Sequence, residues 1–296
     1  MRAGETFGSY EVGELVGSGG FAEVFLCYHR GLQTKVAVKV LHTHLSRDDA
    51  VRERFLQEAQ LQWRADSDRV IQVTHVDQLP DGRPYLVMRY ADLGTLHDVI
   101  HHRDATHGTL FSLKETLGIG LELVDCQGVL RDREIVHREL KPVNVLIKSI
   151  RSPDHRRTEK YGLPDNERLV LSDFGLAKRL REGTNLASQI GGTPLYMAPE
   201  LGSITADVGW QSDLFSVAVI VHELATGTVT WPERTLAQVD DVDLDLVNVS
   251  ETRPDLPPGF DDLLRRGMAI DPADRHESPE AFAEELSDLL TESGPH

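Results

Sequence analysis

Cysteine is scarce in this chain, with two residues among 296. Cys27 and Cys126 lie far apart and neither belongs to a Cys-x-x-Cys pair, which argues against a disulfide framework and against a structural zinc site. A long hydrophobic run is also absent, because no stretch approaches the roughly 18 apolar residues of a membrane span. The first residues lack the basic region and apolar run of a secretory signal. We therefore expect a cytoplasmic protein with no membrane segment in this chain.

Positively charged residues are also outnumbered by negatively charged ones. The chain carries 31 Lys and Arg against 48 Asp and Glu, a formal net charge of −17. Such a balance argues against a surface that neutralises nucleic-acid phosphates and against binding to anionic lipid by charge alone. We expect no nucleic-acid partner, and any protein partner selected by charge should be basic.

The first third of the chain has the pattern of a β-rich unit. Apolar residues alternate between 10 and 40 and are interrupted by Gly-rich breaks, which predicts three short antiparallel strands. Apolar residues at helical spacing predict one amphipathic helix at 47–65. Two further strands are predicted at 70–79 and 83–90, around the turn Pro80-Asp81-Gly82.

Beyond Gly94 the pattern becomes mainly helical. Helices are predicted at 95–100, 112–132, 210–227 and 279–290. The fold class is therefore α+β, with a small β-rich lobe containing one key helix at 1–90 and a larger, mainly helical lobe at 91–296, hinged near 89–94. A polar, Pro-punctuated insertion at 149–168 is predicted to be a surface loop.

A glycine-rich segment, Val-Gly-Ser-Gly-Gly-Phe-Ala-Glu-Val, covers residues 16–24 between two predicted strands. Glycines let the backbone close over phosphate groups with free N–H donors, and Val24 could pack against a flat base. Alone the pattern is weak, since a Gly-rich hairpin is often only a turn.

Lys39 ends the apolar strand segment Val36-Ala37-Val38. A lysine that faces the interior needs an anion, which a nucleotide phosphate would supply. The alternative is a strand lysine that reaches out to solvent. Glu58, on the predicted helix, is the natural carboxylate to hold Lys39 in place.

Three further motifs make the pattern specific. His-Arg-Glu-Leu-Lys-Pro-Val-Asn occupies 137–144, Ser-Asp-Phe-Gly occupies 172–175, and Thr-Pro-Leu-Tyr-Met-Ala-Pro-Glu occupies 193–200. In order, and with the glycine-rich segment, Lys39 and Glu58, they resemble the protein-kinase signature. The resemblance extends from about Tyr10 to about Leu290, and the details look most like the bacterial Ser/Thr kinases.

The resemblance implies a bilobal protein-kinase fold that binds ATP and Mg²⁺. Asn144 and Asp173 would ligate Mg²⁺, and Lys39, held by Glu58, would contact the α and β phosphates. Lys141 would stabilise the transferring phosphoryl group. The residues implied to line the ATP site are Val16, Gly17, Ser18, Gly19, Gly20, Val24, Ala37, Lys39, Met88, Arg89, Tyr90, Ala91 and Leu146.

Regulation is implied by the arginine of the catalytic loop. Arg138 precedes the base position, and in the family this pattern goes with an activation loop ordered by phosphorylation. Thr184 and Ser188 would be the acceptors, although each could equally be a solvated loop hydroxyl. Thr193 would help to order the substrate site.

Three more residues match structural positions of the family. Glu200 and Arg275 would form a buried ion pair, and Asp213 would brace the catalytic loop.

Four residues depart from the family pattern. Glu139 stands where the catalytic base is normally aspartate, and the extra methylene would move the carboxylate by roughly 1 Å. Gln62 takes a position that is normally apolar, where a polar side chain needs a partner. Arg89 replaces an acidic hinge residue, and Ala22 replaces a third glycine.

The expected function is an ATP- and Mg²⁺-dependent Ser/Thr protein kinase with activity reduced by Glu139. The alternative is a pseudokinase, a nucleotide-binding regulatory or scaffolding module. A small-molecule phosphotransferase fits less well, since such enzymes typically lack the Ala-Pro-Glu motif and the partner arginine at 275. The sequence leaves open the substrate, the upstream signal, the oligomeric state, the origin of Glu139 and whether a longer protein contains this chain.

Overall fold

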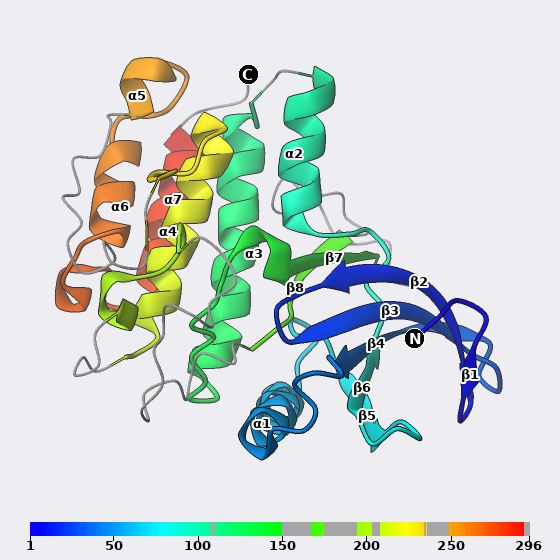
Figure 1. Cartoon of the computed structure of the whole chain (residues 1–296). Coiled ribbons are helices and arrows are strands. Elements are labelled where there is room, and N and C mark those ends of the chain that lie inside the picture. Colours follow the sequence, from blue (N-terminus) through cyan, green and yellow to red (C-terminus); the bar gives the residue numbers. More distant parts are fainter. Residues whose placement is uncertain are drawn as a thin grey trace. The chain divides into compact units, whose positions relative to one another are not determined.

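The chain divides into two compact units (Figure 1). A computed structural model describes residues 1–107, 110–149, 167–174, 194–202, 208–233, 235 and 249–292. The first unit comprises Met1–Asp92 and the segment that begins at Ser172, and the second comprises Leu93–Leu171 and the residues from Thr193 onward. The segment that begins at Ser172 thus belongs with the first unit, where Asp173 pairs with Lys39. In the sequence this segment falls within residues 91–296, which were expected to form the larger lobe.

The second unit is mainly helical. Its α-helices are α2 (Leu96–His107), α3 (Leu113–Arg131), α4 (Gln211–Thr226), α5 (Val249–Thr252), α6 (Phe260–Gly267) and α7 (Pro279–Glu292). Short 3₁₀ turns are η1 (Pro142–Asn144), η4 (Pro199–Gly202) and η6 (Pro272–Asp274), and β7 (Val145–Ser149) pairs antiparallel with β8 (Glu167–Leu171). Helix α4 is buried at every residue from Ser212 to Ala225, which makes it the central element of this unit.

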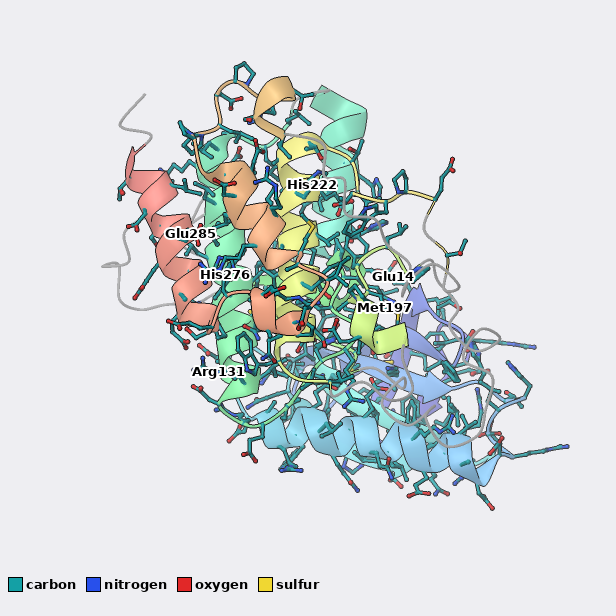
Figure 2. The ribbon with its side chains drawn as sticks, turned by 90° about the vertical axis from the view of Figure 1, so that its left-hand side faces the viewer. Glu14, Arg131, Met197, His222, His276 and Glu285 are labelled. Atoms are coloured by element: carbon teal, nitrogen blue, oxygen red, sulfur yellow. The ribbon has the colours of Figure 1, made fainter. Side chains whose placement is uncertain are left out.

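Helices α3, α4 and α7 pack closely where Gly120 of α3, which has no side chain, faces the other two helices. A Cβ atom at Gly120 of α3 would lie 3.1 Å from Val221 and 3.3 Å from Leu286. Two polar interactions fix the ends of α3. Ser112 and Glu115 form a capping box at its start, and Arg131 at its end (Figure 2) donates to both carboxylate oxygens of Glu280 at 2.5 and 2.8 Å.

The first unit is built on an antiparallel sheet with α1 (Asp49–Ala65) beside it. The sheet order is β1-β2-β3-β4-β6-β5. Its strands are β1 (Thr6–Phe7), β2 (Tyr10–Ser18), β3 (Ala22–His29), β4 (Thr34–Leu41), β5 (Val73–Gln78) and β6 (Pro84–Arg89). The side chain of Asp48 caps α1 by accepting from the backbone N–H groups of Ala50 and Val51 at 2.9 and 3.2 Å.

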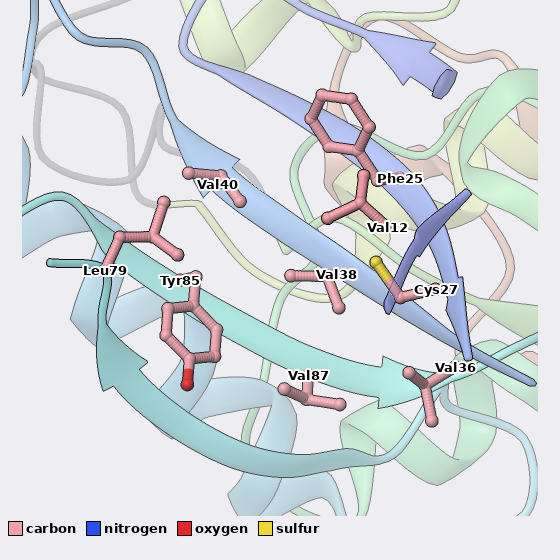
Figure 3. Packing of buried hydrophobic residues seen from close by; sticks show 9 residues of the cluster. All are labelled: Val12, Phe25, Cys27, Val36, Val38, Val40, Leu79, Tyr85 and Val87. Atoms are coloured by element: carbon pink, nitrogen blue, oxygen red, sulfur yellow. The ribbon is translucent and has the colours of Figure 1, made fainter. Parts of the chain in front are cut away.

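Apolar side chains of the strands form two buried clusters. Figure 3 shows the cluster of Val12, Phe25, Cys27, Val36, Val38, Val40, Leu79, Tyr85 and Val87. A second cluster packs α1 against the sheet through Ala22, Leu41, Val51, Phe55, Ala59 and Leu86. Phe55 is completely buried, and its replacement by alanine should cost about 3–5 kcal/mol. This packing fixes α1 against β4, which carries Lys39.

The α+β class predicted from the sequence is confirmed, and each predicted strand and helix has a counterpart. The pattern analysis missed β1 and α5, whose two and four residues are too short to show a period. It also missed the eight-residue α6, although its buried Phe260, Leu263 and Leu264 have helical spacing. Among the described helices, none combines the length and apolar character needed to cross a bilayer.

Candidate active site

Lys39 is the centre of a buried ionic cluster in the first unit. The residue is 7% exposed, and its Nζ lies 2.7 Å from the Oε1 atom of Glu58 on α1. The same nitrogen donates to the carboxylate of Asp173, a residue held at a φ of 57°. The expected pair of Lys39 and Glu58 is therefore present. Asp173, which follows Lys39 by 134 positions in the sequence, is a second acidic partner of the same lysine.

The cluster contains one cation and two carboxylates. Burial raises the pKa of Glu58 to about 7, and the charge of Asp173 adds to this effect while Lys39 opposes it. For Lys39, burial lowers the pKa, but the two carboxylates outweigh burial and hold the pKa above its ordinary value. The ammonium of Lys39 therefore stays charged, while the two acidic groups compete for it and Glu58 is protonated more easily than an exposed glutamate.

The sheet register aligns the residues expected around a nucleotide. Gly17 of β2 lies opposite Val24 of β3, which lies opposite Lys39 of β4. In the same way Ala37 of β4 lies opposite Met88 of β6. The other residues implied to line the ATP site in this unit lie nearby in sequence: Val16 and Ser18 on β2, Gly19 and Gly20 in the following turn, Arg89 at the end of β6, and Tyr90 and Ala91 just beyond it.

His42 supports the glycine-rich turn and was not predicted from the sequence. Its ring Nε2 lies 2.8 Å from the carbonyl oxygen of Gly19, and its backbone N–H donates to the carbonyl of Phe21 at 2.9 Å. Because a carbonyl only accepts, this ring nitrogen carries the proton. No motif marks His42, so only the three-dimensional arrangement reveals the contact.

Gln62 has the partner that its polar side chain requires. The residue is 2% exposed, and its amide nitrogen donates to the carbonyl of Ile71 at 2.8 Å and approaches the sulfur of Met88 at 3.9 Å. A satisfied buried amide costs far less than an orphaned one. Since Gln62 lies one helical turn after Glu58, the contact also anchors the part of α1 that carries Glu58.

The catalytic-loop segment, residues 137–144, lies in the second unit and is held by hydrogen bonds to α4. The carboxylate of Asp213 is buried and accepts from the backbone N–H groups of His137 and Arg138, each at 2.8 Å. Burial raises the pKa of Asp213, and the charges and N–H groups of the two loop residues oppose that rise. Arg138 has a φ of 67°, a left-handed conformation that these two hydrogen bonds help to hold.

Glu139 and Lys141 pair with each other. Lys141 Nζ lies 2.9 Å from Glu139 Oε1, and both side chains are partly exposed. The side-chain amide of Asn144 donates to the backbone carbonyl of Glu139 at 2.8 Å, which orients the buried Asn144 at the end of η1. Leu146 follows on β7.

Asn144 of the second unit and Asp173 of the first unit each carry an oxygen ligand of the kind that Mg²⁺ takes. Asn144 offers an amide oxygen and Asp173 a carboxylate, the hard ligands that Mg²⁺ prefers. The carboxylate side chain of Asp173 is 44% exposed, so it remains accessible to an incoming ion.

The expected ion pair between Glu200 and Arg275 is present in the second unit. Arg275 Nη1 and Nη2 donate to the two carboxylate oxygens of Glu200 at 2.7 and 2.8 Å, and Ser212 Oγ donates to the same carboxylate at 2.6 Å. Burial raises the pKa of Glu200, but Arg275 and Ser212 outweigh it and hold the pKa below its ordinary value. A neighbouring contact was not predicted: the Tyr196 hydroxyl donates to Glu223 at 2.8 Å.

Thr184, Ser188 and Thr193 lie outside the residues that the structure describes, so their regulatory roles remain predictions.

Known proteins resemble this chain over most of its length. The protein kinase domain family matches residues 10–286. The serine/threonine-protein kinase PknK of Mycobacterium tuberculosis is 31% identical over 291 residues, which cover 95% of this chain and 24% of PknK. PksC of Streptomyces coelicolor is 31% identical over 287 residues, covering 94% of this chain and 48% of PksC. The chain thus spans about a quarter to a half of the length of these relatives.

Solved structures agree with these matches. The crystal structure of the Mycobacterium tuberculosis PknI kinase domain aligns with a TM-score of 0.70 at 26% identity, covering 98% of this chain and 99% of that domain. The predicted kinase fold is thereby confirmed, and the similar proteins are bacterial Ser/Thr kinases, as the motifs implied. From the matched domain and the motifs now placed in the structure, it follows that the chain belongs to the protein kinase family.

Proposed function

We propose that this chain is an ATP- and Mg²⁺-dependent Ser/Thr protein kinase that transfers the γ-phosphoryl group of ATP to protein hydroxyls. The observation that carries the proposal is the buried Lys39, held by Glu58 and Asp173 in a chain that belongs to the kinase family. A buried cation with two acidic partners is costly to maintain for structure alone. It is well suited to orient an anionic phosphate chain.

The nucleotide-binding roles follow from the chemistry of each group. Lys39 would bind the α and β phosphates, and the backbone N–H groups of the glycine-rich turn would bind phosphate oxygens. Asp173 and Asn144 would hold Mg²⁺, which when bound neutralises phosphate charge. Met88 and the backbone from Arg89 to Ala91 would contact the adenine.

The catalytic loop would supply the remaining groups. Glu139 would accept the proton of the substrate hydroxyl, and Lys141 would stabilise the transferring phosphoryl group. The ion pair between them holds the Glu139 carboxylate beside Lys141, and a displacement of roughly 1 Å from the aspartate position can cost about 10²-fold in rate. Positioning and electrostatics provide most of the acceleration in phosphoryl transfer, so we expect reduced activity rather than none.

Regulation and partners complete the proposal. Phosphorylation of Thr184 or Ser188 would give Arg138 an anionic partner, and Thr193 would help to order the substrate. The net charge of −17 favours basic protein substrates. We propose a cytoplasmic location for this kinase domain.

A label-transfer experiment tests the proposal and separates it from a pseudokinase. The chain is incubated with γ-labelled ATP, Mg²⁺ and a generic basic protein, beside a Lys39→Met variant. Lys114→Met, which removes an exposed lysine at the start of α3, serves as the matched control. We expect transfer by the parent and by Lys114→Met and loss of transfer in Lys39→Met. Transfer at the Lys39→Met level in all three proteins would overturn the proposal.

A further inference from the structure

Helix α2 carries two histidines that the proposed kinase chemistry does not use. His97 and His101 are separated by four positions, so they lie on the same face of the helix one turn apart. Both are exposed, and their ring centroids are 4.0 Å apart with the ring planes at 74°. Two imidazoles at this spacing are the simplest helical arrangement that can bind one metal ion from two sides.

The electrostatics keep His97 available as a ligand. The His97 side chain is only partly shielded from water, but this desolvation lowers its pKa; the neighbouring His101 lowers the pKa further, and Asp98 opposes both. A lowered pKa favours the neutral imidazole, which is the form that coordinates metals. Asp98 itself is engaged at the start of the helix, because its carboxylate accepts from the backbone N–H of Thr95 at 2.9 Å and from the Thr95 hydroxyl at 2.8 Å.

We propose that His97 and His101 together bind one divalent transition-metal ion of the Zn²⁺, Ni²⁺ or Cu²⁺ class, separately from Mg²⁺. Zinc-to-nitrogen bonds of about 2.0–2.1 Å would place two such ring centroids about 5 Å apart. The exposed rings therefore need to separate by about 1 Å, which small side-chain rotations provide. Water completes the coordination, because the described residues contain no group of three or more His, Cys, Asp or Glu placed to hold a metal.

Ligand chemistry separates this site from the proposed nucleotide site. Imidazole nitrogens suit Zn²⁺, Ni²⁺ and Cu²⁺, whereas Mg²⁺ prefers the oxygen ligands of Asn144 and Asp173. Excess Mg²⁺ should therefore leave the histidine site occupied by Zn²⁺. Because a metal binds the neutral form of imidazole, protons compete with it and binding should weaken in acid.

Metal titration of the untagged chain tests the proposal. Zn²⁺ is distributed between the protein and a chromogenic chelator, in the presence of excess Mg²⁺, for the parent and for His97→Ala and His101→Ala. His102→Ala is the matched control, since this exposed histidine is adjacent in sequence but points to a different side of α2. Circular dichroism verifies that each variant retains its helices.

The expected result is one Zn²⁺ site whose affinity drops at least about 10-fold in His97→Ala and in His101→Ala and stays within about twofold in His102→Ala. A Cu²⁺ spectrum showing two coordinated nitrogens in the parent, and fewer in either single variant, would support the same pair. Absence of Zn²⁺ binding by the parent, or equal affinity in His97→Ala, would show that the two rings make only an aromatic contact. Neither outcome bears on phosphoryl transfer, so the kinase proposal is tested separately.

Discussion

Removing the arginine of the buried ion pair should destabilise the second unit strongly. Arg275 is 2% exposed and donates to Glu200 through both terminal nitrogens. It also donates to the backbone carbonyls of Gln211 and Ala269, each at 2.8 Å, and its guanidinium lies 5.0 Å from the ring centre of Phe215. Arg275→Met keeps most of the aliphatic volume but deletes all of these donors.

The magnitude follows from what the substitution leaves behind. The Glu200 carboxylate would stay buried with Ser212 as its remaining side-chain donor, and breaking such a buried pair costs about 3–5 kcal/mol. For a chain of 296 residues the loss corresponds to a drop in Tm of roughly 5–8 °C. Arg265→Met, which breaks an exposed pair with Asp262 on α6, should cost less than about 1 kcal/mol.

The assay is denaturant unfolding followed by circular dichroism, at neutral pH and at low pH. The folded-state pKa of Glu200 lies below its ordinary value, so the stabilisation from the pair is present above about pH 4.5 and is lost as the pH falls below it. The stability difference between parent and Arg275→Met should therefore shrink in acid. The double variant Glu200→Met with Arg275→Met should recover part of the loss. A cost below about 1 kcal/mol for Arg275→Met, equal to that of Arg265→Met, would refute this reasoning.

Substitutions at three positions and one ligand give further tests. Glu139→Asp should raise turnover roughly 10- to 100-fold with little change in affinity for ATP. A variant as inactive as the parent would contradict the idea that the longer side chain limits the rate, and a slower variant would show that the enzyme uses glutamate as its proper base. His42→Ala should raise the KM for ATP about fivefold by loss of one hydrogen bond to Gly19, while His42→Gln, which retains a donor, should not; equal effects would reject the contact. Burial holds the pKa of His276 below its ordinary value despite the contact with Glu285 (Figure 2). The unfolded chain therefore binds this proton at a higher pH than the folded chain, and stability is lost as the pH falls below about 6.5. His276→Gln should flatten this fall between about pH 7 and 5.5, and an unchanged slope would contradict the assignment. Mg²⁺ with ATP should raise the Tm, and no shift at millimolar nucleotide would contradict binding.

Local periodicity predicted most of the secondary structure. The strand pattern at 10–40 corresponds to β2, β3 and β4, and the helical spacing at 47–65 corresponds to α1. Each of these elements is marked by the regular spacing of apolar residues within one segment, and this spacing can be read directly from the sequence. The kinase motifs added an expected order of functional groups, including the pair of Lys39 with Glu58.

Several contacts between residues from different segments of the chain could not be predicted. The contact of Asp173 with Lys39 spans 134 positions and was not anticipated, although both residues were expected at the nucleotide site. Gln62 was recognised as unusual, but its partner is a backbone carbonyl at Ile71, which no side-chain pattern encodes. His42 and the Tyr196 contact with Glu223 likewise depend on how neighbouring segments pack.

Intact-mass spectrometry tests phosphoryl transfer by this chain most directly. The purified parent, Glu139→Asp and Lys39→Met are measured before and after incubation with ATP and Mg²⁺, each with a basic protein as acceptor. We predict phosphoryl mass increments on the acceptor with the parent, faster increments with Glu139→Asp, and none with Lys39→Met. The absence of any increment with both the parent and Glu139→Asp, in samples where Mg²⁺ and ATP still raise the Tm, would contradict the kinase proposal and identify the chain as a nucleotide-binding pseudokinase.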